Sequence, residues 1–393
     1  MRRLLRSLVR SSAPVVAVAL TEACAAISRP PTTIPALQAE RVTSRAAELV
    51  TTDTVIARLV RRVQRRGDRT IDILMLSGGG QHGAYGAGFL RGWGTRPEGK
   101  MPTFDLVTGV SAGGLQSPLA FLGTPSSLDT LSMLFREAVE RTKPSIDWLF
   151  WLRKTGGVVS TGKLERTIGQ VFDSTMIRRL QRELANDRQL VIGTTDGDLG
   201  IARTWDLRHV LDQPQGDARA RLLMKATSAI PGIFPPVVID GHVHFDGGIV
   251  SNVMPVLDLD AFRRLGERLR AAGVQEPVTV RLWLVMNLFA EVPTKVLNPA
   301  SRKAMNYRAL ELLFFSQQAT MFARFENLVR AASQTAPGLT IELRGTAIDG
   351  ALIHEPGAGE LFDKAWMLRM ETYGFDRARG TDLWDVVVEG AKR

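Results

Sequence analysis

The chain has 393 residues, 45% of them hydrophobic, and its 50 Lys and Arg outweigh 40 Asp and Glu to give a formal net charge of +10. This is the composition of a globular protein with material for one large core or two modest ones, which excludes the low-complexity and disordered classes. The sequence shows no internal repeat and no motif of a nucleic-acid-binding module, so we expect no nucleic-acid partner.

Residues 1–28 follow the order of an export signal. Four arginines fall within the first ten residues, a short apolar run covers residues 13–20, and small residues follow as TEACAAIS. The apolar run is too short to cross a bilayer as a helix. The sequence therefore predicts a signal peptide over residues 1–23 and export across the inner membrane.

Cys24 is the only cysteine, so no disulfide within the chain is possible. Ala23-Cys24-Ala25 resembles the cleavage box of bacterial lipoproteins, although Thr21 and Glu22 depart from the usual pattern. The resemblance implies that Cys24 becomes a lipid-bearing N-terminus that anchors the protein to a membrane. The alternative is ordinary cleavage after Ala25, which leaves a periplasmic or secreted protein.

A tether and a helix are expected next, over residues 24–67. Residues 27–37 are proline-rich and polar, which favours an extended tether, and a helical pattern covers residues 46–66. The helix ends in arginines at 61, 62, 65 and 66, which we expect on a solvated helix face rather than in a nucleic-acid patch. Without residues 1–23 the net charge is +7, which favours attraction to an anionic membrane surface.

A G-x-S-x-G turn follows a predicted strand over residues 104–108. Gly109 and Gly113 allow the chain to reverse around Ser111, and a helical pattern comes directly after the turn. Strand, tight turn and helix are the setting of a nucleophile elbow, in which the serine hydroxyl is exposed at a helix N-terminus. By itself the pattern also fits a serine that only caps a helix.

A second glycine-rich turn precedes the elbow in the chain. The apolar strand predicted over residues 73–76 breaks into Gly78, Gly79 and Gly80, and a helix resumes from about Gly83. Successive glycines can aim several N–H groups at one point, as an acyl-transfer oxyanion requires. The segment SGGGQHGAYGAG lacks the ending of a P-loop and matches a dinucleotide-binding loop poorly. We interpret the two turns as halves of one site.

The middle of the chain reads as alternating helices and strands. An amphipathic helix is expected over residues 128–141, and the aromatic residues Trp148, Phe150 and Trp151 fit core packing or, in a lipid-handling protein, an acyl-binding wall or a lid. Strands are expected over residues 189–193 and 201–206.

A hairpin turning at Asp240-Gly241 follows a short helix expected over residues 224–230. On its second strand His242, His244 and Asp246 alternate and share one face. The triplet invites a metal interpretation, but no further ligand pair stands nearby, so we expect no metal and no cofactor.

The last third continues the alternation of helices and strands. Helices are expected over residues 257–272, 302–333 and 360–374, and strands over 278–288 and 339–344. The sequence predicts one α/β domain over residues 68–393, with a motif-bearing core over about 71–256 and a C-terminal extension over about 257–393 that widens the sheet.

Three ordered motifs make the chain similar to the patatin-like phospholipase family. They are the Gly78–Gly80 segment, the serine turn at Ser111, and Asp246-Gly247-Gly248 in HVHFDGGIVSN. The resemblance implies a three-layer α/β/α fold with a mainly parallel central sheet. It implies a Ser–Asp dyad with Ser111 as nucleophile and Asp246 as base, and an oxyanion held by Gly78, Gly79 and Gly80.

Two positions depart from the family pattern. His82 stands where the family usually has Arg or Lys, which puts an anchoring role of that side chain in doubt. Asn252 and Pro255 are one residue further apart than the family's Asn-x-Pro, which indicates an altered loop. A Ser-His-Asp triad would require His354, and no motif places it near the elbow, so we favour the dyad.

The expected function is therefore that of a lipid acyl hydrolase of the phospholipase A kind, acting on phospholipids or related lipids at a membrane. Two alternatives remain: a general carboxylesterase or thioesterase for soluble acyl substrates, and a membrane-tethered binding protein without catalytic activity. The oligomeric state is not determined by the sequence.

Overall fold

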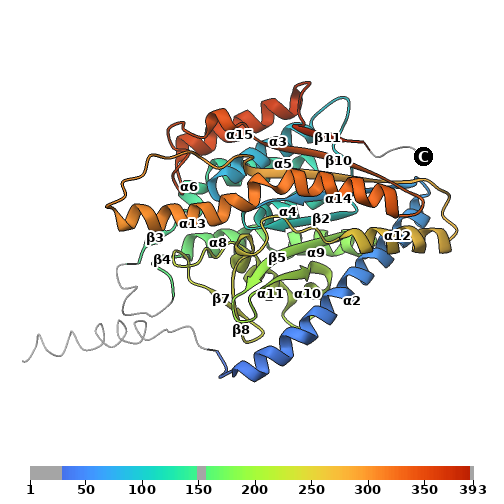
Figure 1. The fold of residues 1–393 in the computed structure, drawn as a ribbon, viewed down its shortest axis with the longest axis horizontal. Helices are drawn as coiled ribbons and strands as arrows, with labels where there is room; N and C mark the ends of the chain where they lie inside the picture. The colour runs from blue at the N-terminus through green and yellow to red at the C-terminus, as the bar shows by residue number, and fades with distance from the viewer. Residues whose placement is uncertain (1–28, 148–155, 390–393) are drawn as a thin grey trace, which may run out of the picture.

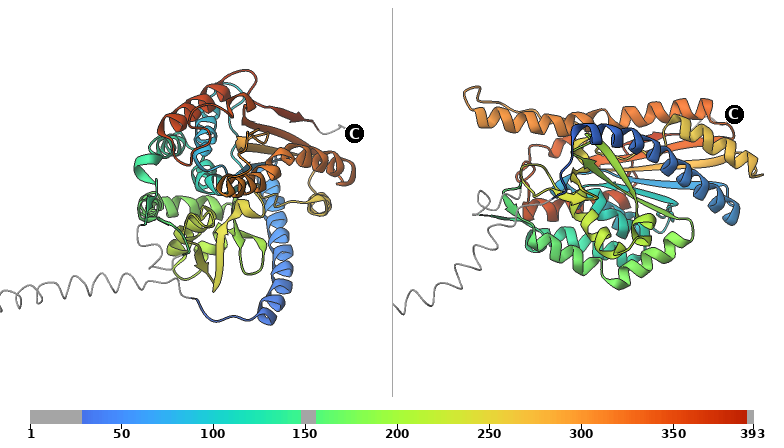
Figure 2. Two further views of the ribbon diagram at one scale, coloured as in Figure 1. Left: turned by 60° about the vertical axis from the view of Figure 1, so that its left-hand side comes forward. Right: turned by 90° about the horizontal axis from the view of Figure 1, so that it is seen from below.

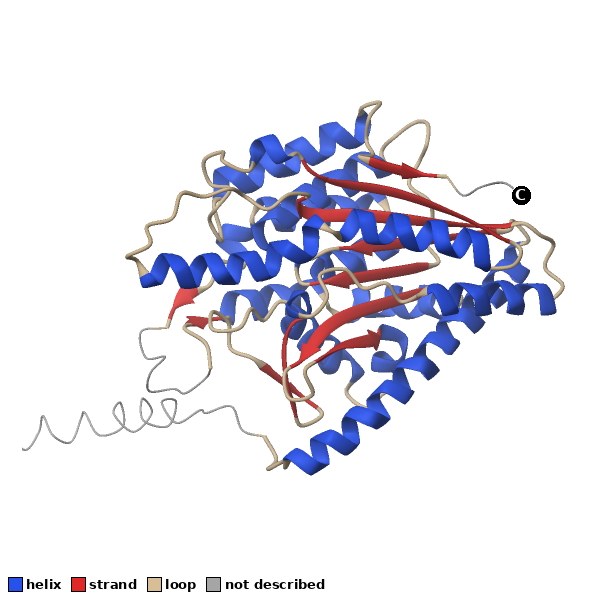
Figure 3. Cartoon of the chain, viewed as in Figure 1, coloured by secondary structure: helices blue, strands red, loops and turns tan. Residues whose placement is uncertain are grey.

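A mixed nine-stranded sheet with helices on both faces is the centre of the fold (Figures 1 and 3). The computed structural model describes residues 29–147 and 156–389. The strand order is β11-β10-β9-β1-β2-β5-β8-β7, with β6 paired to β5 on the side of the main path. The strands are β1 Thr70–Leu76, β2 Leu106–Val110, β5 Gln189–Asp196, β6 Ile201–Asp206, β7 Val237–Ile239, β8 His242–Asp246, β9 Val278–Phe289, β10 Leu339–Ile348 and β11 Val386–Val388.

The five central strands, β10, β9, β1, β2 and β5, run parallel, while β6, β7, β8 and β11 pair antiparallel at the edges. The predicted α/β class with a mainly parallel sheet is thereby confirmed. A separate two-stranded sheet is formed by β3 (Ser145–Ile146) and β4 (Val159–Ser160).

Helices cover the two faces of the sheet in separate layers, as Figure 2 shows in its right-hand view. One layer contains α2 Ile34–Arg66, α12 Leu259–Ala271, α13 Arg302–Ala319 and α14 Met321–Thr335. The other contains α3 Gly83–Gly94, α4 Ala112–Leu122, α5 Pro125–Arg136, α6 Ala138–Arg141, α8 Gly162–Val171, α9 Ser174–Ala185, α10 Leu207–Asp212, α11 Gly216–Thr227 and α15 Lys364–Arg379. Three short 3-10 turns complete the described elements: η1 Gly80–His82, η2 Gly247–Ile249 and η3 Gly350–Leu352.

Strand β1 shows why both faces of the sheet are buried. Ile71, Ile73 and Met75 face the core beneath α2, α12 and α14, whereas Leu74 and Leu76 face the core shared with α3 and α4. Side chains alternate along a strand, so a strand covered on both sides reads as a continuous apolar run. The run predicted as a strand from residue 73 is therefore buried throughout.

The start of α2 shortens the extended tether expected over residues 27–37, because residues 34–37 are helical whereas 29–33 form no helix or strand. The helix begins at Ile34, with the Thr33 hydroxyl accepting the Ala36 N–H and Pro35 in the first turn. Proline is well suited to this position because its missing N–H has no partner in the first turn of a helix, so the proline-rich pattern marked a helix start.

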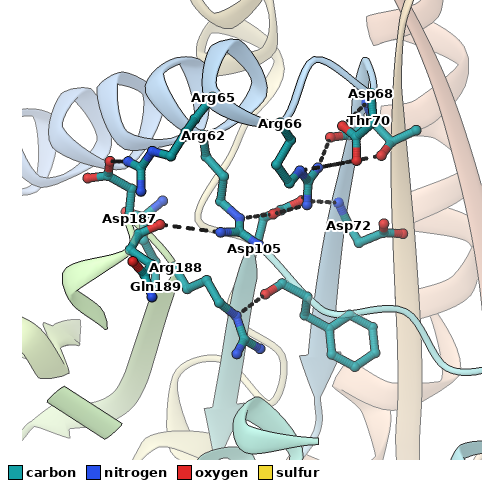
Figure 4. A network of polar contacts seen from close by, with 12 residues as sticks. Arg62, Arg65, Arg66, Asp68, Thr70, Asp72, Asp105, Asp187, Arg188 and Gln189 are labelled. Atoms are coloured by element: carbon teal, nitrogen blue, oxygen red, sulfur yellow. Dashed lines mark hydrogen bonds and ion pairs between the residues drawn. The ribbon is translucent and has the colours of Figure 1, made fainter. Parts of the chain in front are cut away.

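The arginines at the end of α2 correct in part the expectation of a solvated helix face. Arg62 and Arg66 turn inward and pair with the buried Asp105 (Figure 4). Arg61 and Arg65 remain about half exposed and pair with Asp187. Asp105 also accepts the N–H of Asp72 at 2.8 Å, so the cluster ties α2 to the starts of β1, β2 and β5. The basic run is a structural clamp because buried carboxylates require charged partners.

Smaller differences concern element ends. The helix expected over residues 302–333 is two helices that meet at Thr320, and the one expected over 128–141 is α5 and α6, with Glu137 between them. The helix expected over 224–230 begins earlier, at Gly216. The proposed signal peptide, Cys24 and the aromatic residues Trp148, Phe150 and Trp151 lie outside the described residues. Over the described ranges, no helix is long and apolar enough to cross a membrane.

Candidate active site

Ser111 stands on the sharp turn between β2 and α4. Its φ of 54° and ψ of −123° lie in a region that residues other than glycine rarely adopt, which is backbone strain held by the surrounding structure. The turn is tight enough that a side chain on Gly109 would lie 2.3 Å from the Gly113 carbonyl, and one on Gly113 would lie 2.4 Å from the Leu76 carbonyl. The glycines of the G-x-S-x-G pattern are thus required by close backbone packing.

Asp246 ends β8 and meets Ser111 across β5. In register, Asp246 pairs with Thr194 on β5, and β5 in turn lies beside β2. The Ser111 hydroxyl donates to Asp246 Oδ2 at 2.5 Å, and Asp246 Oδ1 accepts the Gly248 N–H at 2.8 Å. The two side chains are therefore hydrogen-bonded neighbours although 135 residues separate them.

Burial controls the charge state of this carboxyl. Asp246 is 3% exposed, and its desolvation raises the pKa to about 6, while the hydrogen bonds from Ser111 and Gly248 favour the charged form. A carboxyl with a pKa near 6 is a stronger base than a solvated aspartate and is still ionised at neutral pH. The environment therefore prepares Asp246 to accept a proton.

The glycine segment 78–80 curves over the serine, and its three glycines are not equivalent. The Gly78 N–H donates to the Asn252 carbonyl at 3.2 Å, whereas those of Gly79 and Gly80 donate to no acceptor within the described residues. A side chain on Gly79 would lie 1.9 Å from the Asn287 carbonyl, and Gly80 has a φ of 56°. Gly79 and Gly80 are thus the two glycines with N–H groups available to a ligand.

The neighbouring glycines pack equally closely. A Cβ at Gly247 would lie 2.7 Å from the Gly193 carbonyl, and one at Gly248 would lie 3.0 Å from Asn252 Oδ1. Side chains at either position would push β8 away from β5 or displace the Asp246 turn, so these two glycines allow the carboxyl to approach the serine.

Three buried polar residues that the sequence motifs do not include support the site. Thr227 accepts the Ser111 N–H at 3.0 Å and donates to the Gly193 carbonyl at 2.6 Å. Asn287 holds the backbone of Ser77, just before the glycines, and exchanges hydrogen bonds with Gln116. Thr227 lies on α11, Asn287 on β9 and Gln116 on α4. In the sequence, the only sign of their role is that each is a polar residue next to apolar ones.

The C-terminal extension is fastened directly to the glycine segment. Gln81, 2% exposed, donates to the Gly357 carbonyl and accepts the Asp363 N–H, both at 2.7 Å. His82 accepts the Trp366 indole N–H at 3.0 Å, and burial lowers its pKa to about 4. A neutral histidine thus occupies the position where the family pattern has a basic residue, and it anchors the segment through an aromatic partner.

An apolar pocket opens beside Ser111. Among the described residues, no charged side chain lines it. Its walls come from α4, α5, α8 and the segments before β7 and α15, with Phe135, Ile168, Phe172 and Phe362 among the larger contributors. Such a pocket accommodates a hydrocarbon chain whose reactive end lies at the serine.

None of the five histidines, all in the described ranges, hydrogen-bonds to Ser111 or Asp246. His354 is exposed and lies 3.3 Å from the Thr294 hydroxyl, and the buried His244 bonds to Thr194. His242 lies between Asp196 and Glu40, so the His-x-His-x-Asp triplet is divided among different partners.

A possible cation cluster does exist elsewhere among the described residues. Ligand atoms of Asp196, Asp198 and His242 lie within 4.8 Å of one another. Each of these side chains already has a protein partner, including Arg29 at Asp198 and the Leu199 N–H at Asp196. The arrangement is a closed hydrogen-bonded network, and it carries no metal assignment.

A second Asp-Gly turn has nearly the same local geometry as the first. Asp349-Gly350-Ala351 also opens a 3-10 turn, and Asp349 accepts the N–H two residues later, as Asp246 does. Asp349 is exposed and follows β10, away from the serine turn. Only the Asp246 turn, which follows a strand paired with β5, faces Ser111.

Comparison with known proteins gives a family match over the region that holds these motifs. Residues 74–260 match the family model described as patatin-like phospholipase. A solved structure to which the chain is similar is described as the crystal structure of VipD from Legionella pneumophila, with 13% identity and a TM-score of 0.32; the match covers 79% of this chain and 66% of that one, just under two thirds. No curated protein sequence matches the chain.

Proposed function

From the patatin-like phospholipase domain that this chain carries over residues 74–260, we propose that it hydrolyses carboxylic esters of phospholipids or related lipids through Ser111 and Asp246. The observation that carries the proposal is the 2.5 Å hydrogen bond between the serine hydroxyl and a buried aspartate at the end of an apolar pocket. A serine hydroxyl becomes an effective nucleophile only when a base removes its proton, and Asp246 is the base in reach.

The first half of the proposed reaction forms an acyl-enzyme. Asp246 takes the proton from Ser111 as Oγ attacks the ester carbonyl carbon, and the N–H groups of Gly79 and Gly80 hold the resulting oxyanion. The tetrahedral intermediate collapses with cleavage of the bond to the alcohol oxygen. Asp246 returns the proton to that oxygen, and the alcohol or lysolipid leaves.

Water completes the second half of the reaction. Asp246 removes a proton from a water molecule that attacks the acyl carbonyl carbon, and the same N–H groups stabilise the second oxyanion. Collapse of this intermediate returns the proton to Ser111 Oγ and releases a fatty acid. Each half uses one carboxylate, so a dyad suffices.

The lining of the pocket supports a lipid substrate over a small soluble ester. The described lining of the pocket is almost wholly apolar, so a long hydrocarbon chain gains more favourable burial along it than a short acyl group does. Burial contributes roughly 0.8 kcal/mol for each methylene group. We therefore propose that specificity rises with acyl-chain length.

The proposal is tested with Ser111→Ala and Asp246→Asn. Each should lower fatty acid release from phosphatidylglycerol vesicles, and hydrolysis of short and long soluble esters, by at least about a thousandfold, because the nucleophile or the base is lost. Asp349→Asn, in a similar Asp-Gly turn away from the serine, is the matched control and should retain parental rates.

Three outcomes separate the alternatives. Retained turnover in both site variants would reject the dyad. Faster hydrolysis of short soluble esters than of long ones would favour a general esterase. An unaltered chain that neither turns over esters nor reacts at Ser111 with a fluorophosphonate probe would be a binding protein on a hydrolase fold.

A further inference from the structure

Large apolar side chains are exposed on segments that follow β8, β9 and β10. Val296 is fully exposed, and Leu361, Val250 and Leu312 are 49%, 41% and 41% exposed. We use the name apolar rim for the set Ile249, Val250, Val296, Leu297, Leu312 and Leu361. Scattered exposed apolar residues need no explanation, but a set gathered at one edge of the molecule does.

Contacts connect the rim to the pocket on one side. Leu361 lines the pocket together with Ser111 and is itself half exposed. The segment that carries Leu361 follows His354, whose ring lies 3.3 Å from the Thr294 hydroxyl. Thr294 is two residues from Val296, so the loop after β9 contacts the segment that precedes Leu361.

Contacts also connect the rim to α13. Lys295 pairs with Glu311 at 2.7 Å, which places the Val296 loop against α13. Further along α13, Gln317 donates to the Ile249 carbonyl, next to the Asp246 turn. These contacts place the Val296 loop and the Ile249 turn against the same helix.

The sheet topology puts all of these segments at one edge of the molecule. The Ile249 turn follows β8, the Val296 loop follows β9, and the segment before Leu361 follows β10. The parallel strands β1, β2, β9 and β10 end at the edge where the serine turn and the glycine segment lie, and the start of α13 projects from the same edge (Figure 1).

We propose that the apolar rim docks onto a lipid bilayer, with the pocket mouth facing the hydrocarbon. The choice of face rests on the proposed function, because Leu361 of the rim lines the pocket that holds Ser111. Side chains carried on separate loops and a helix can insert individually into the interface, which is the manner of an amphipathic peripheral anchor. A protein partner on this surface would instead cover the mouth.

The exposed half of α2 supplies a matched comparison. Val42 and Leu49 are 70% and 61% exposed there, and α2 crosses the molecule away from the projecting end of α13 (Figures 1 and 2). Val296 and Leu297 are the same residue types on the rim. Replacing each pair by asparagine makes identical chemical changes at two separate surfaces.

The experiment measures vesicle binding in full-length chains that carry Ser111→Ala and Cys24→Ser, so that neither turnover nor lipid attachment contributes. Sedimentation uses vesicles of phosphatidylcholine alone and with phosphatidylglycerol. Val296→Asn with Leu297→Asn should weaken partitioning about tenfold on both vesicles, because two side chains no longer insert. Val42→Asn with Leu49→Asn should leave partitioning within about twofold of the parent. Thermal unfolding confirms that both pairs are folded.

The outcomes are distinct from those of the proposed function. If the variant with both rim substitutions binds vesicles as well as the parent does, the rim does not contact the bilayer, and a protein partner becomes the better explanation of this surface. Loss of binding in the α2 pair alone would move the docking face to α2, and a parent that binds neither vesicle would exclude docking. None of these results depends on ester turnover, which is measured separately in the chain with Ser111 intact.

Discussion

At the scale of single residues, the site contains two energetically unfavourable features, a strained backbone and a buried carboxyl, that contacts elsewhere in the fold compensate. Ser111 is held at a positive φ, and Asp246 is buried with a raised pKa. The Ser111 N–H is fixed by Thr227, and the second oxygen of Asp246 is fixed by the Gly248 N–H. These contacts keep the hydroxyl and the carboxylate in place before a substrate arrives.

The raised pKa of Asp246 predicts the pH dependence of catalysis. A protonated carboxyl cannot accept the serine proton, so kcat/KM for a soluble ester should rise with pH and level off above a midpoint near 6. Stopped assays between pH 4.5 and 8.5 measure this, with the folded fraction at each pH checked by circular dichroism. A kcat/KM midpoint near pH 4 would show that Asp246 is not desolvated. A midpoint near pH 7 that is also found in His244→Gln and in His82→Gln would indicate that another group acts as the base.

At the scale of elements, hydrogen bonds hold the residues on either side of the glycine segment. Asn287 on β9 donates to the Ser77 carbonyl just before it, and Gln81 just after it bonds to Gly357 and Asp363. The same segment carries Leu361 and Phe362, which line the pocket. Residues beyond the family-matched region therefore hold the proposed oxyanion donors and form part of the acyl wall.

Gln81→Met should lower kcat about tenfold with a smaller effect on KM. Displaced N–H groups would stabilise the oxyanion of the transition state less well, whereas binding of the uncharged ester depends on them less. Initial-rate kinetics with a soluble long-chain ester measure the two constants. Gln64→Met is the matched control, since the Gln64 amide also donates to a distant carbonyl, that of Ala272, but at the end of α2. An unchanged kcat in Gln81→Met would show that the clamp does not position the donors.

At the scale of the whole molecule, stability against acid depends on buried neutral histidines. Burial lowers the pKa of both His82 and His244 to about 4, whereas the unfolded chain has histidines near 6.5. The unfolded state therefore binds more protons between these values, and the stabilising contribution, complete above pH 6.5, is lost as pH falls towards 4. Asp246 acts in the opposite direction between about 4 and 6 because its pKa is raised on folding.

We expect the free energy of unfolding to decrease between pH 7 and 4.5 by about 2 kcal/mol for each of these two histidines, offset in part by Asp246. Urea unfolding at a series of pH values measures the decrease. His82→Gln keeps an acceptor for Trp366 and should make the decrease shallower by about 2 kcal/mol. His354→Gln, at an exposed position, should not change it. An equally steep decrease in His82→Gln would mean that His82 is protonated in the folded chain.

Much of this protein follows from local patterns. Continuous apolar runs between glycine turns predict a parallel sheet covered on both faces, and the spacing around Ser111 predicts the strand–turn–helix, because both depend on neighbours within a few residues. The start of α2 was harder to predict, since Pro35 is equally compatible with a tether and with a first helical turn. The pairing of the α2 arginines depends on Asp105 and Asp187, which are distant in the chain.

The sequence by itself determined the α/β class and the serine turn, and its resemblance to a family singled out Asp246 as the base. Only the tertiary structure showed the hydrogen bond between Asp246 and Ser111, which forms because β8 pairs with β5, whereas the similar turn at Asp349 follows β10 on the far side of β1. It also separated Gly78, which bonds to Asn252, from Gly79 and Gly80, and it brought Gln81 to the C-terminal segment. Local geometry is set by neighbouring residues, but which hydrogen-bonding groups meet across the sheet is set by strand order.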